Sequence, residues 1–270
     1  MKKILAIALS VVLLLSLAAC GGKTYTKTGS YSSYAIEGLD EIEYVFAVSK
    51  NAANGDKYLA EINKIIANKD MAELLKRYTD GPRPWDKDYL GEIDVSDNKG
   101  LDPIIIYTAV LTPFQFSGAY GAGVDGLDMY IIAQMAENLN MEAKFQDTSY
   151  ELGYEKVKSG EGEILASAVV LTEEVKADFK VSNVYLKSKL HIVCDKGYAF
   201  TSLKELKGFK VGVIPGRYSA KLVKETLGDS VEIVEFYTDA EVKAALQFEN
   251  IDAFVIDELS AKHMVGLLNK

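Results

Sequence analysis

The segment Gly216-Arg217-Tyr218 combines features suited to holding an acidic group. It follows a predicted strand over residues 210–214 and opens a predicted helix at Ser219. Backbone N–H groups at a helix start attract anions, and an arginine adds donors in a rigid, bidentate fork. We therefore hypothesise that Arg217 and these amides hold the acidic group of a ligand, with Tyr218 packing on it. The competing interpretation places Arg217 on the solvated surface.

A glycine pattern raises a different chemistry. Residues 121–126 match the G-x-G-x-x-G pattern of dinucleotide-binding proteins, and Asp147 follows Gly126 by 21 residues. In those proteins the glycines come directly after a strand, so that the helix start meets the pyrophosphate. Here ten residues separate Val110, where the preceding predicted strand ends, from Gly121. An NAD-dependent enzyme is therefore the weaker alternative, and we expect no cofactor.

Covalent catalysis has little support in the sequence. Neither a G-x-S-x-G nor an H-E-x-x-H motif occurs, and His191 and His263 lie 72 residues apart. Two cysteines and two histidines also leave little material for a zinc site or a disulfide framework. We expect neither a catalytic residue nor a metal, and so the protein is not predicted to be an enzyme.

The N-terminus reads as an export signal. Lys2 and Lys3 precede an apolar run over 4–17, which ends in Ala18-Ala19-Cys20. Because a membrane-spanning helix needs about 20 apolar residues, a transmembrane segment is the poorer interpretation. Residues 17–21 resemble a lipobox, which implies cleavage after residue 19 and lipid attachment to Cys20. Residues 20–27 would then form a tether on the outer side of the membrane.

Charge and composition narrow the classes further. The chain of 270 residues is 49% hydrophobic and 26% charged, which is ordinary for a globular protein. Its net charge is −9, and removal of Lys2 and Lys3 with the signal makes it 28 − 39 = −11. Nucleic acid is therefore not the expected partner, because phosphate binding needs a basic face. With Cys20 acylated, Cys194 would remain unpaired in a buried strand.

Hydrophobic periodicity predicts two α/β lobes. Strands are predicted over 34–36 and 43–48, followed by helix over 56–78 with a break at Lys69-Asp70. A Gly- and Pro-containing linker covers 79–102. Strands then alternate with helices, which predicts parallel sheets with helices on both faces and a ligand at the carboxyl ends of the strands. The further strands are predicted at 104–110, 143–146, 164–169, 189–194, 210–214, 231–236 and 253–256, and the helices at 127–139, 150–158, 172–179, 203–206, 219–227, 239–247 and 258–268.

An ordered set of short motifs is similar to a known family. The set comprises Pro113-Phe114, Gly126-Leu127-Asp128 and the segments 158–160, 163–167, 171–174, 181–185, 203–208, 211–213 and 251–258. Together they resemble the family 3 extracellular solute-binding proteins, which are receptors of amino-acid ABC importers. The resemblance implies a two-lobed, type II periplasmic-binding fold and an ABC permease as partner.

The order of the motifs departs from that family. Its members continue after the Asp-Glu motif into a further strand and helices, whereas this sequence ends soon after Asp257-Glu258. Residues 43–50, 60–64 and 75–78 resemble that missing piece, so we infer a circular permutation joined by the linker 79–102. An unrelated N-terminal module is the alternative. The expected organisation is signal peptide 1–19, tether 20–27, lobe 1 at 41–187, and lobe 2 at 28–40 plus 189–270.

The resemblance also implies roles for individual residues. Family members clamp an α-amino acid with an Arg on its carboxylate, an acidic group on its ammonium and an aromatic ring on its side chain. Asp257 matches the acidic position, although it is equally placed to stabilise a helix start. The expected Arg is Val175 here, and the serine two residues before Thr172 is Val170. Of the neighbouring hydroxyl positions, Ser167 remains and Ala168 does not, although both are expected near the ligand, and Phe114, with Phe116 and Tyr120, would wall the cleft.

These features predict a lipid-anchored, extracytoplasmic and monomeric solute receptor of an ABC importer. It would capture an amino acid or a similar small polar or zwitterionic metabolite between its lobes. Its expected ligand-binding residues are Phe114, Ser167, Ala168, Arg217, Tyr218 and Asp257. Because the usual carboxylate-binding Arg is missing, a sensor or adhesin that keeps the fold without transport is the alternative.

Overall fold

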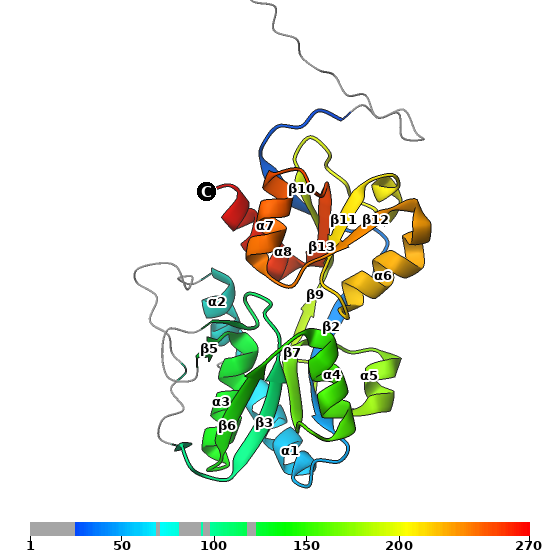
Figure 1. The fold of residues 1–270 in the computed structure, drawn as a ribbon. Helices are drawn as coiled ribbons and strands as arrows, with labels where there is room; N and C mark the ends of the chain where they lie inside the picture. Colours follow the sequence, from blue (N-terminus) through cyan, green and yellow to red (C-terminus); the bar gives the residue numbers. More distant parts are fainter. Residues whose placement is uncertain (1–24, 69–70, 81–92, 94–97, 118–122) are drawn as a thin grey trace, which may run out of the picture.

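The chain folds as two lobes, each built on its own sheet (Figure 1). The computed structural model describes residues 25–68, 71–80, 93, 98–117 and 123–270. The predicted signal peptide, Cys20 and most of the predicted linker 79–102 lie outside these residues. We call the described residues 42–188 lobe 1 and the described residues 25–36 with 190–270 lobe 2. Among the helices of the described part, none is both long and apolar enough to cross a lipid bilayer.

Lobe 1 contains a six-stranded sheet in the order β6-β3-β7-β2-β8, with β9 also pairing with β2. Its β3, β6 and β7 are parallel, but β2 enters antiparallel to β7, β8 and β9. The prediction of parallel sheets therefore holds for β3, β6 and β7 but not for β2, because strand direction depends on distant pairing. The strands are β2 (Ile42–Ser49), β3 (Pro103–Thr108), β6 (Glu142–Asp147), β7 (Ile164–Val170), β8 (Phe179–Val181) and β9 (Leu186–Ser188).

Strand β2 shows why this sheet is covered on both faces. Successive side chains of a strand point to opposite sides. Tyr44, Phe46 and Val48 belong to the core under α1 and α3, whereas Val45 and Ala47 belong to the core under α4. The helices are α1 (Gly55–Ile66), α2 (Met71–Asp80), α3 (Leu127–Asn138), α4 (Tyr150–Ser159) and α5 (Glu173–Asp178), and β4 (Phe116–Ser117) pairs with β5 (Val124–Asp125) beside them.

Lobe 2 contains a five-stranded sheet in the order β1-β10-β13-β11-β12. Strands β11, β12 and β13 are parallel, while β10 and β1 add antiparallel strands at one side. The strands are β1 (Tyr31–Ala35), β10 (Leu190–Asp195), β11 (Lys210–Val213), β12 (Glu232–Glu235) and β13 (Ala253–Asp257). The helices are α6 (Tyr218–Leu227), α7 (Asp239–Gln247) and α8 (Glu258–Leu268), with short 3₁₀ turns η2 (Leu203–Leu206) and η3 (Gly228–Ser230).

Side-chain caps fix where the helices that follow strands begin. Ser149 accepts from Leu152 N–H at the start of α4, and Thr172 accepts from Val175 N–H at the start of α5. Thr238 starts α7 with a capping box. Such caps satisfy orphan N–H groups and stabilise a helix by roughly 1 kcal/mol each. They therefore hold the strand-to-helix junctions that face the other lobe.

The described chain begins in lobe 2. The carboxylate of Asp195 accepts from the N–H and hydroxyl of Thr28, at 2.8 and 3.0 Å, and from the N–H groups of Gly29 and Gly197, both at 2.7 Å. These bonds keep the pKa of Asp195 below its usual value, although burial opposes them. The N-terminal segment is thereby fastened to the end of β10.

The chain passes between the lobes twice. Residues 36–42 lead from β1 to β2, and Lys189 alone separates β9 from β10. In Figure 1, the antiparallel strands β2 and β9 lie next to each other at the end of lobe 1 that faces lobe 2. Two short, adjacent connections of this kind allow hinge motion of one lobe against the other.

Candidate functional site

A cavity of about 540 Å³ lies between the lobes. It is bordered by strand ends and helix starts from both sheets, which is where ligands bind in open α/β sheets. Lobe 1 contributes Tyr44, Tyr150 and Ala168, among others, and lobe 2 contributes Arg217 and Asp257. The remaining lining residues are Ile42, Leu111, Glu151, Tyr154, Glu155, Val170, Thr172, Glu173, Glu174, Val175, Leu190, Gly216, Tyr218, Ser219, Lys221, Leu222, Glu225 and Ile256.

Asp257 lines this cavity, and its two carboxylate oxygens have different surroundings. It is the last residue of β13 and the N-cap of α8, where Oδ1 accepts from Leu259 N–H at 2.9 Å and Ser260 N–H at 3.1 Å. Burial raises its pKa, while these amides, the Ser260 side chain and the charge of Arg217 oppose the rise. The side chain is 2% exposed, and no described residue donates a hydrogen bond of ordinary geometry to Oδ2. Both predicted roles are therefore compatible in one residue: one oxygen caps the helix and the other is available.

Arg217 is buried, which excludes its interpretation as a solvated surface residue. It is the N-cap of α6 and is 4% exposed. Its Nη1 donates to the Ser167 carbonyl, and its Nη2 donates to the Ser167 hydroxyl at 2.9 Å and to the Ala109 carbonyl at 3.4 Å. Its Nε has no acceptor among the described residues. The guanidinium thus reaches across to lobe 1 and keeps one donor unused.

The neighbours of Arg217 show how tightly the lobes approach. Gly216 has φ +73°, and a Cβ there would lie 2.3 Å from Cγ of Glu151 in lobe 1. Tyr218 is half-buried and lines the cavity, as does Ser219, whose buried hydroxyl finds no acceptor or donor within the described chain. The positive φ favours glycine at position 216, and a larger residue there would require the side chain of Glu151 to shift.

Two further polar contacts join the lobes near the cavity. The Thr112 hydroxyl in lobe 1 donates to Asp239 in lobe 2 at 2.9 Å, and Asp239 also lies 3.3 Å from Nε2 of the buried His263. At the rim, Lys221 of α6 pairs with Glu174 of α5 at 2.8 Å. With the contacts of Arg217, these interactions describe a closed arrangement of the two lobes.

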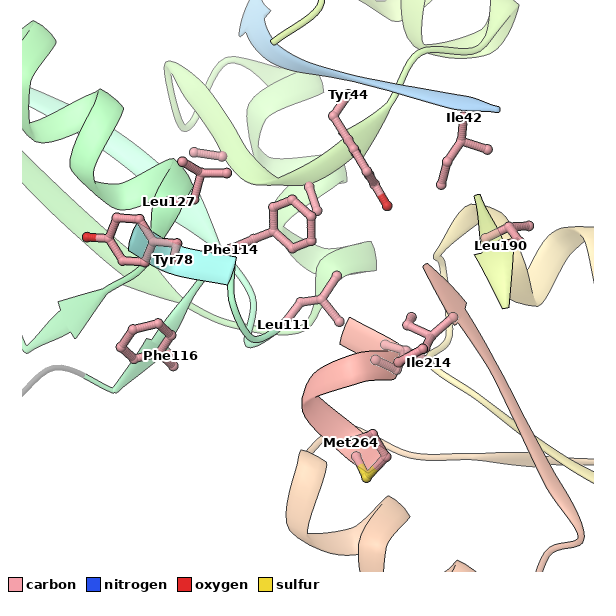
Figure 2. Packing of buried hydrophobic residues seen from close by; sticks show 14 of the residues in the cluster. Ile42, Tyr44, Tyr78, Leu111, Phe114, Phe116, Leu127, Leu190, Ile214 and Met264 are labelled. Atoms are coloured by element: carbon pink, nitrogen blue, oxygen red, sulfur yellow. The ribbon is translucent and has the colours of Figure 1, made fainter. Parts of the chain in front are cut away.

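Phe114 lies in the core beside the cavity rather than among its lining residues. It is fully buried, and its ring centroid is 5.0 Å from that of Tyr44. Figure 2 shows Phe114 within the apolar cluster, while the hydroxyl of Tyr44 points toward the space near Leu190 and Ile214. Phe116 is likewise buried, and Tyr120 lies outside the described residues. The aromatic wall expected from Phe114 is supplied instead by Tyr44 and Tyr150.

Ser167 and Ala168 occupy different positions although they are adjacent. Ser167 is fully buried and meets the site only through Arg217. Ala168 borders the cavity with φ +50°, a conformation that side-chain-bearing residues rarely adopt. Its N–H donates to Oδ2 of Asp128 at 2.7 Å. Backbone strain of this kind persists where surrounding contacts hold it, as the bond to Asp128 does here.

Asp128 is a buried acid that sequence reasoning did not assign to the site. Besides Ala168 N–H, it accepts a hydrogen bond from the Tyr185 hydroxyl at 2.6 Å. Burial raises its pKa to about 6, and these two bonds and the charge of Arg217 limit the rise. Tyr44 and Tyr150, which line the cavity, and Asp128, which supports Ala168, were all missed, because their positions depend on tertiary packing. The only sequence signal was the position of Tyr150 and Asp128 at predicted helix starts.

The glycine pattern has a packing explanation. Gly126 has φ +131°, and a Cβ there would lie 2.2 Å from the Phe114 carbonyl oxygen. Phe114 O accepts from Asp128 N–H at 3.1 Å, so the loop backbone occupies the start of α3. The last glycine of the motif thus serves close backbone packing, and the α3 start is not open to a pyrophosphate.

The fold and the cavity between two sheets define a two-lobed binding protein. Residues 104–201 match the model of the bacterial extracellular solute-binding proteins, family 3. Over these residues the chain is similar to that family, whose members are binding proteins.

Individual relatives bind amino acids. The chain is 25% identical over 138 residues to the ABC transporter glutamine-binding protein GlnH of Bacillus subtilis, covering 50% of each chain. It is 26% identical over 162 residues to a probable histidine-binding protein of Neisseria gonorrhoeae, covering 59% of this chain and 60% of that one. Among solved structures, an ancestral arginine-binding protein bound to arginine matches with TM-score 0.57 and 27% identity, covering 61% of this chain and 74% of that one. The matches thus span about half to three quarters of these relatives.

Proposed function

We propose that this protein is an extracytoplasmic receptor of an ABC importer that captures an amino acid or a similar small zwitterionic metabolite between its lobes. The single observation that carries the proposal is a pair of opposite, buried and unused groups in one cavity. Nε of Arg217 can donate to an acidic group, and Oδ2 of Asp257 can accept from an ammonium. Buried polar groups are ordinarily satisfied, so such a pair fits a ligand that carries both charges.

Binding would need no covalent step. Charge-assisted hydrogen bonds in a water-poor cavity are stronger than neutral ones, and the unused hydroxyl of Ser219 offers a further bond. A solute lacking either charge would leave Arg217 or Asp257 unsatisfied and would be rejected for that reason. The similarity to glutamine- and histidine-binding proteins agrees with this class of solute.

The experiment is a thermal-shift and calorimetric screen of amino acids and small polar metabolites. Protein freed of carried-over solute by reversible unfolding should be stabilised by at least one zwitterion, because binding only the folded state raises the melting temperature. Asp257→Asn should lose most of that affinity, since asparagine still caps α8 but no longer balances an ammonium. Glu258→Gln is the matched control, because that adjacent carboxylate pairs with Lys262 outside the cavity. Equal binding by both variants would contradict the proposal.

We further infer that the protein is anchored by lipid on Cys20 and that its chain is circularly permuted. The position of β2 between β7 and β8 supports the permutation, because an N-terminal strand then completes the sheet begun at β3. Membrane fractionation of Cys20→Ser would test the anchor, with release into the soluble fraction expected. A chain restarted at residue 103, with residues 25–80 attached through a linker after residue 270, should fold and bind the same solute if the permutation is correct.

A further inference from the structure

The guanidinium of Arg217 lies in a cage made entirely by lobe 1. Three neutral oxygens accept from its terminal nitrogens: the Ser167 carbonyl, the Ser167 hydroxyl at 2.9 Å and the Ala109 carbonyl at 3.4 Å. The ring of Tyr150 covers the group, with its centroid 4.5 Å from Cζ. An aromatic face together with several hydrogen-bond acceptors suits a planar, delocalised cation.

This cage is fixed by contacts that do not involve Arg217. The Ser167 hydroxyl donates to the Ala109 carbonyl at 2.7 Å and accepts from Ala109 N–H at 3.2 Å. Ser167 is fully buried, and Tyr150 is 8% exposed at the start of α4. The acceptors therefore keep their positions when the lobes separate, because both lie on neighbouring ends of the same sheet.

Charge attraction alone does not explain where Arg217 lies. Within the described residues, Asp257 and Asp128 act on Arg217 only as longer-range charges. A buried cation is normally paired with a carboxylate, since its desolvation is costly. Here the side chain ends among neutral groups of the other lobe.

We propose that Ala109, Ser167 and Tyr150 form a guanidinium-binding site on lobe 1, which Arg217 fills from lobe 2 as a tethered ligand that holds the lobes closed. In ordinary two-lobed receptors the solute bridges the lobes, whereas here the chain supplies one bridge itself. A small alkylguanidinium is the class of molecule that this site would accept when Arg217 is absent. The inference concerns the same cavity as the proposed function but does not depend on which solute, if any, is captured there.

The test compares wild type with Arg217→Ala in the full chain, with methylguanidinium chloride as the probe at low millimolar concentration. The variant should show saturable stabilisation by the probe, with a melting temperature raised by about 2–4 °C at concentrations well above its dissociation constant. Methylammonium is the matched control, because it carries the same charge without the planar fork. Wild type, whose cage is filled, should not respond to either compound beyond the effect of salt.

A second variant locates the site. Arg217→Ala combined with Tyr150→Leu should lose the response to methylguanidinium, because the aromatic face is gone. If Arg217→Ala does not fold, Arg217→Lys takes its place, since it keeps a cation on the same stem without the fork. Small-angle scattering should show a larger radius of gyration for either single variant than for wild type.

The outcomes separate this inference from the proposed function. An equal response of wild type and variant to the probe, or an equal response with and without Tyr150, would overturn the guanidinium site. An unchanged radius of gyration would overturn the closing role. Failure of every amino acid to bind wild type would overturn the proposed function alone.

Discussion

The two walls of the cavity use different chemistry. Lobe 2 brings the ionised groups, Arg217 and Asp257, each as the first cap of a helix that follows a parallel strand. Around the guanidinium of Arg217, lobe 1 offers neutral carbonyls, a hydroxyl and the ring of Tyr150, although four of its glutamates also line the cavity: Glu151, Glu155, Glu173 and Glu174. The comparison shows that a cation carried by one lobe can be bound by neutral groups of the other, through a long side chain that crosses between them.

Lobe 1 also holds a buried acid, Asp128, that is not among the residues lining the cavity. Asp128 is fully buried and fastens the strained Ala168 and the Tyr185 hydroxyl. In lobe 2 the carboxylate of Asp257 keeps one oxygen available, whereas both oxygens of Asp128 are occupied. Asp128 therefore supports the wall of lobe 1, whereas Asp257 lines the cavity itself.

The largest expected effect is on the loop that orders the lobe 1 wall. Gly126→Ala would place a Cβ 2.2 Å from Phe114 O, a backbone atom that cannot turn aside. We expect a loss of about 3–5 kcal/mol in the free energy of unfolding, measured with urea. Gly208→Ala in lobe 2 is the control, since it has a similar positive φ of +84° and nothing within 4 Å. Gly208→Ala should lower the free energy of unfolding by only about 1 kcal/mol. Equal losses for the two variants would show that the lobe 1 wall is not closely packed at Gly126.

The next effect is a pH dependence that belongs to lobe 1. The pKa of Asp128 rises from 3.8 to about 6 on folding, so between those values the native state holds the proton more tightly than the unfolded chain. The contribution of protonated Asp128 to the free energy of unfolding is therefore complete below about pH 4. It is lost as the pH rises through 6, and the total loss is roughly 2–3 kcal/mol. Urea unfolding from pH 4 to 7 measures the difference in free energy of unfolding between wild type and Asp128→Asn. That difference isolates the contribution of Asp128. A difference that stays constant with pH would contradict it.

A smaller effect tests the neutral cage. Tyr150→Leu removes the ring over Arg217 and should cost about 1–2 kcal/mol, because the buried cation loses its aromatic face. Tyr150→Phe keeps the ring and should cost less than about 0.5 kcal/mol. Calorimetric melting of both variants makes the measurement. If Phe and Leu are equally damaging, the hydroxyl rather than the ring is the important group.

The smallest effect lies at the rim, where the lobes are joined by ordinary surface charges. Lys221 and Glu174 are 56% and 60% exposed, so water and salt screen the pair. A double-mutant cycle of Lys221→Ala and Glu174→Ala should give a coupling of about 0.5 kcal/mol or less. A coupling as large as that expected for Tyr150 would mean that closure depends on the rim and not on the buried contacts.

Much of the fold could be predicted from local pattern. The helices at 239–247 and 258–268 were predicted with the bounds that α7 and α8 have, because capping residues and apolar spacing mark their ends. Strands β8 and β9 were missed, since three residues carry no measurable period. The antiparallel entry of β2 was missed as well, because pairing direction is set by partners more than 100 residues away.

The site was predicted more fully in lobe 2 than in lobe 1, where Ala168 is the predicted residue that lines the cavity. Arg217 and Asp257 stand at strand-to-helix junctions that a sequence displays directly, and both line the cavity. The contacts of the Arg217 side chain could not be predicted, because its partner Ser167 lies on the other lobe, 50 positions away in the sequence. Phe114 failed as a wall residue for the same reason: whether an aromatic ring faces a cleft or a core depends on the helix that packs over it.

The fastening of Thr28 and Gly29 to Asp195 has a mechanical consequence. A force applied to the N-terminal end acts first on lobe 2. The hydrogen bonds to Asp195 resist it before it reaches the interlobe connections at 36–42 and Lys189. If the N-terminal side of the chain is anchored, lobe 2 is held in place and lobe 1 is the lobe that moves. The moving part would then be the lobe that carries the neutral cage around Arg217.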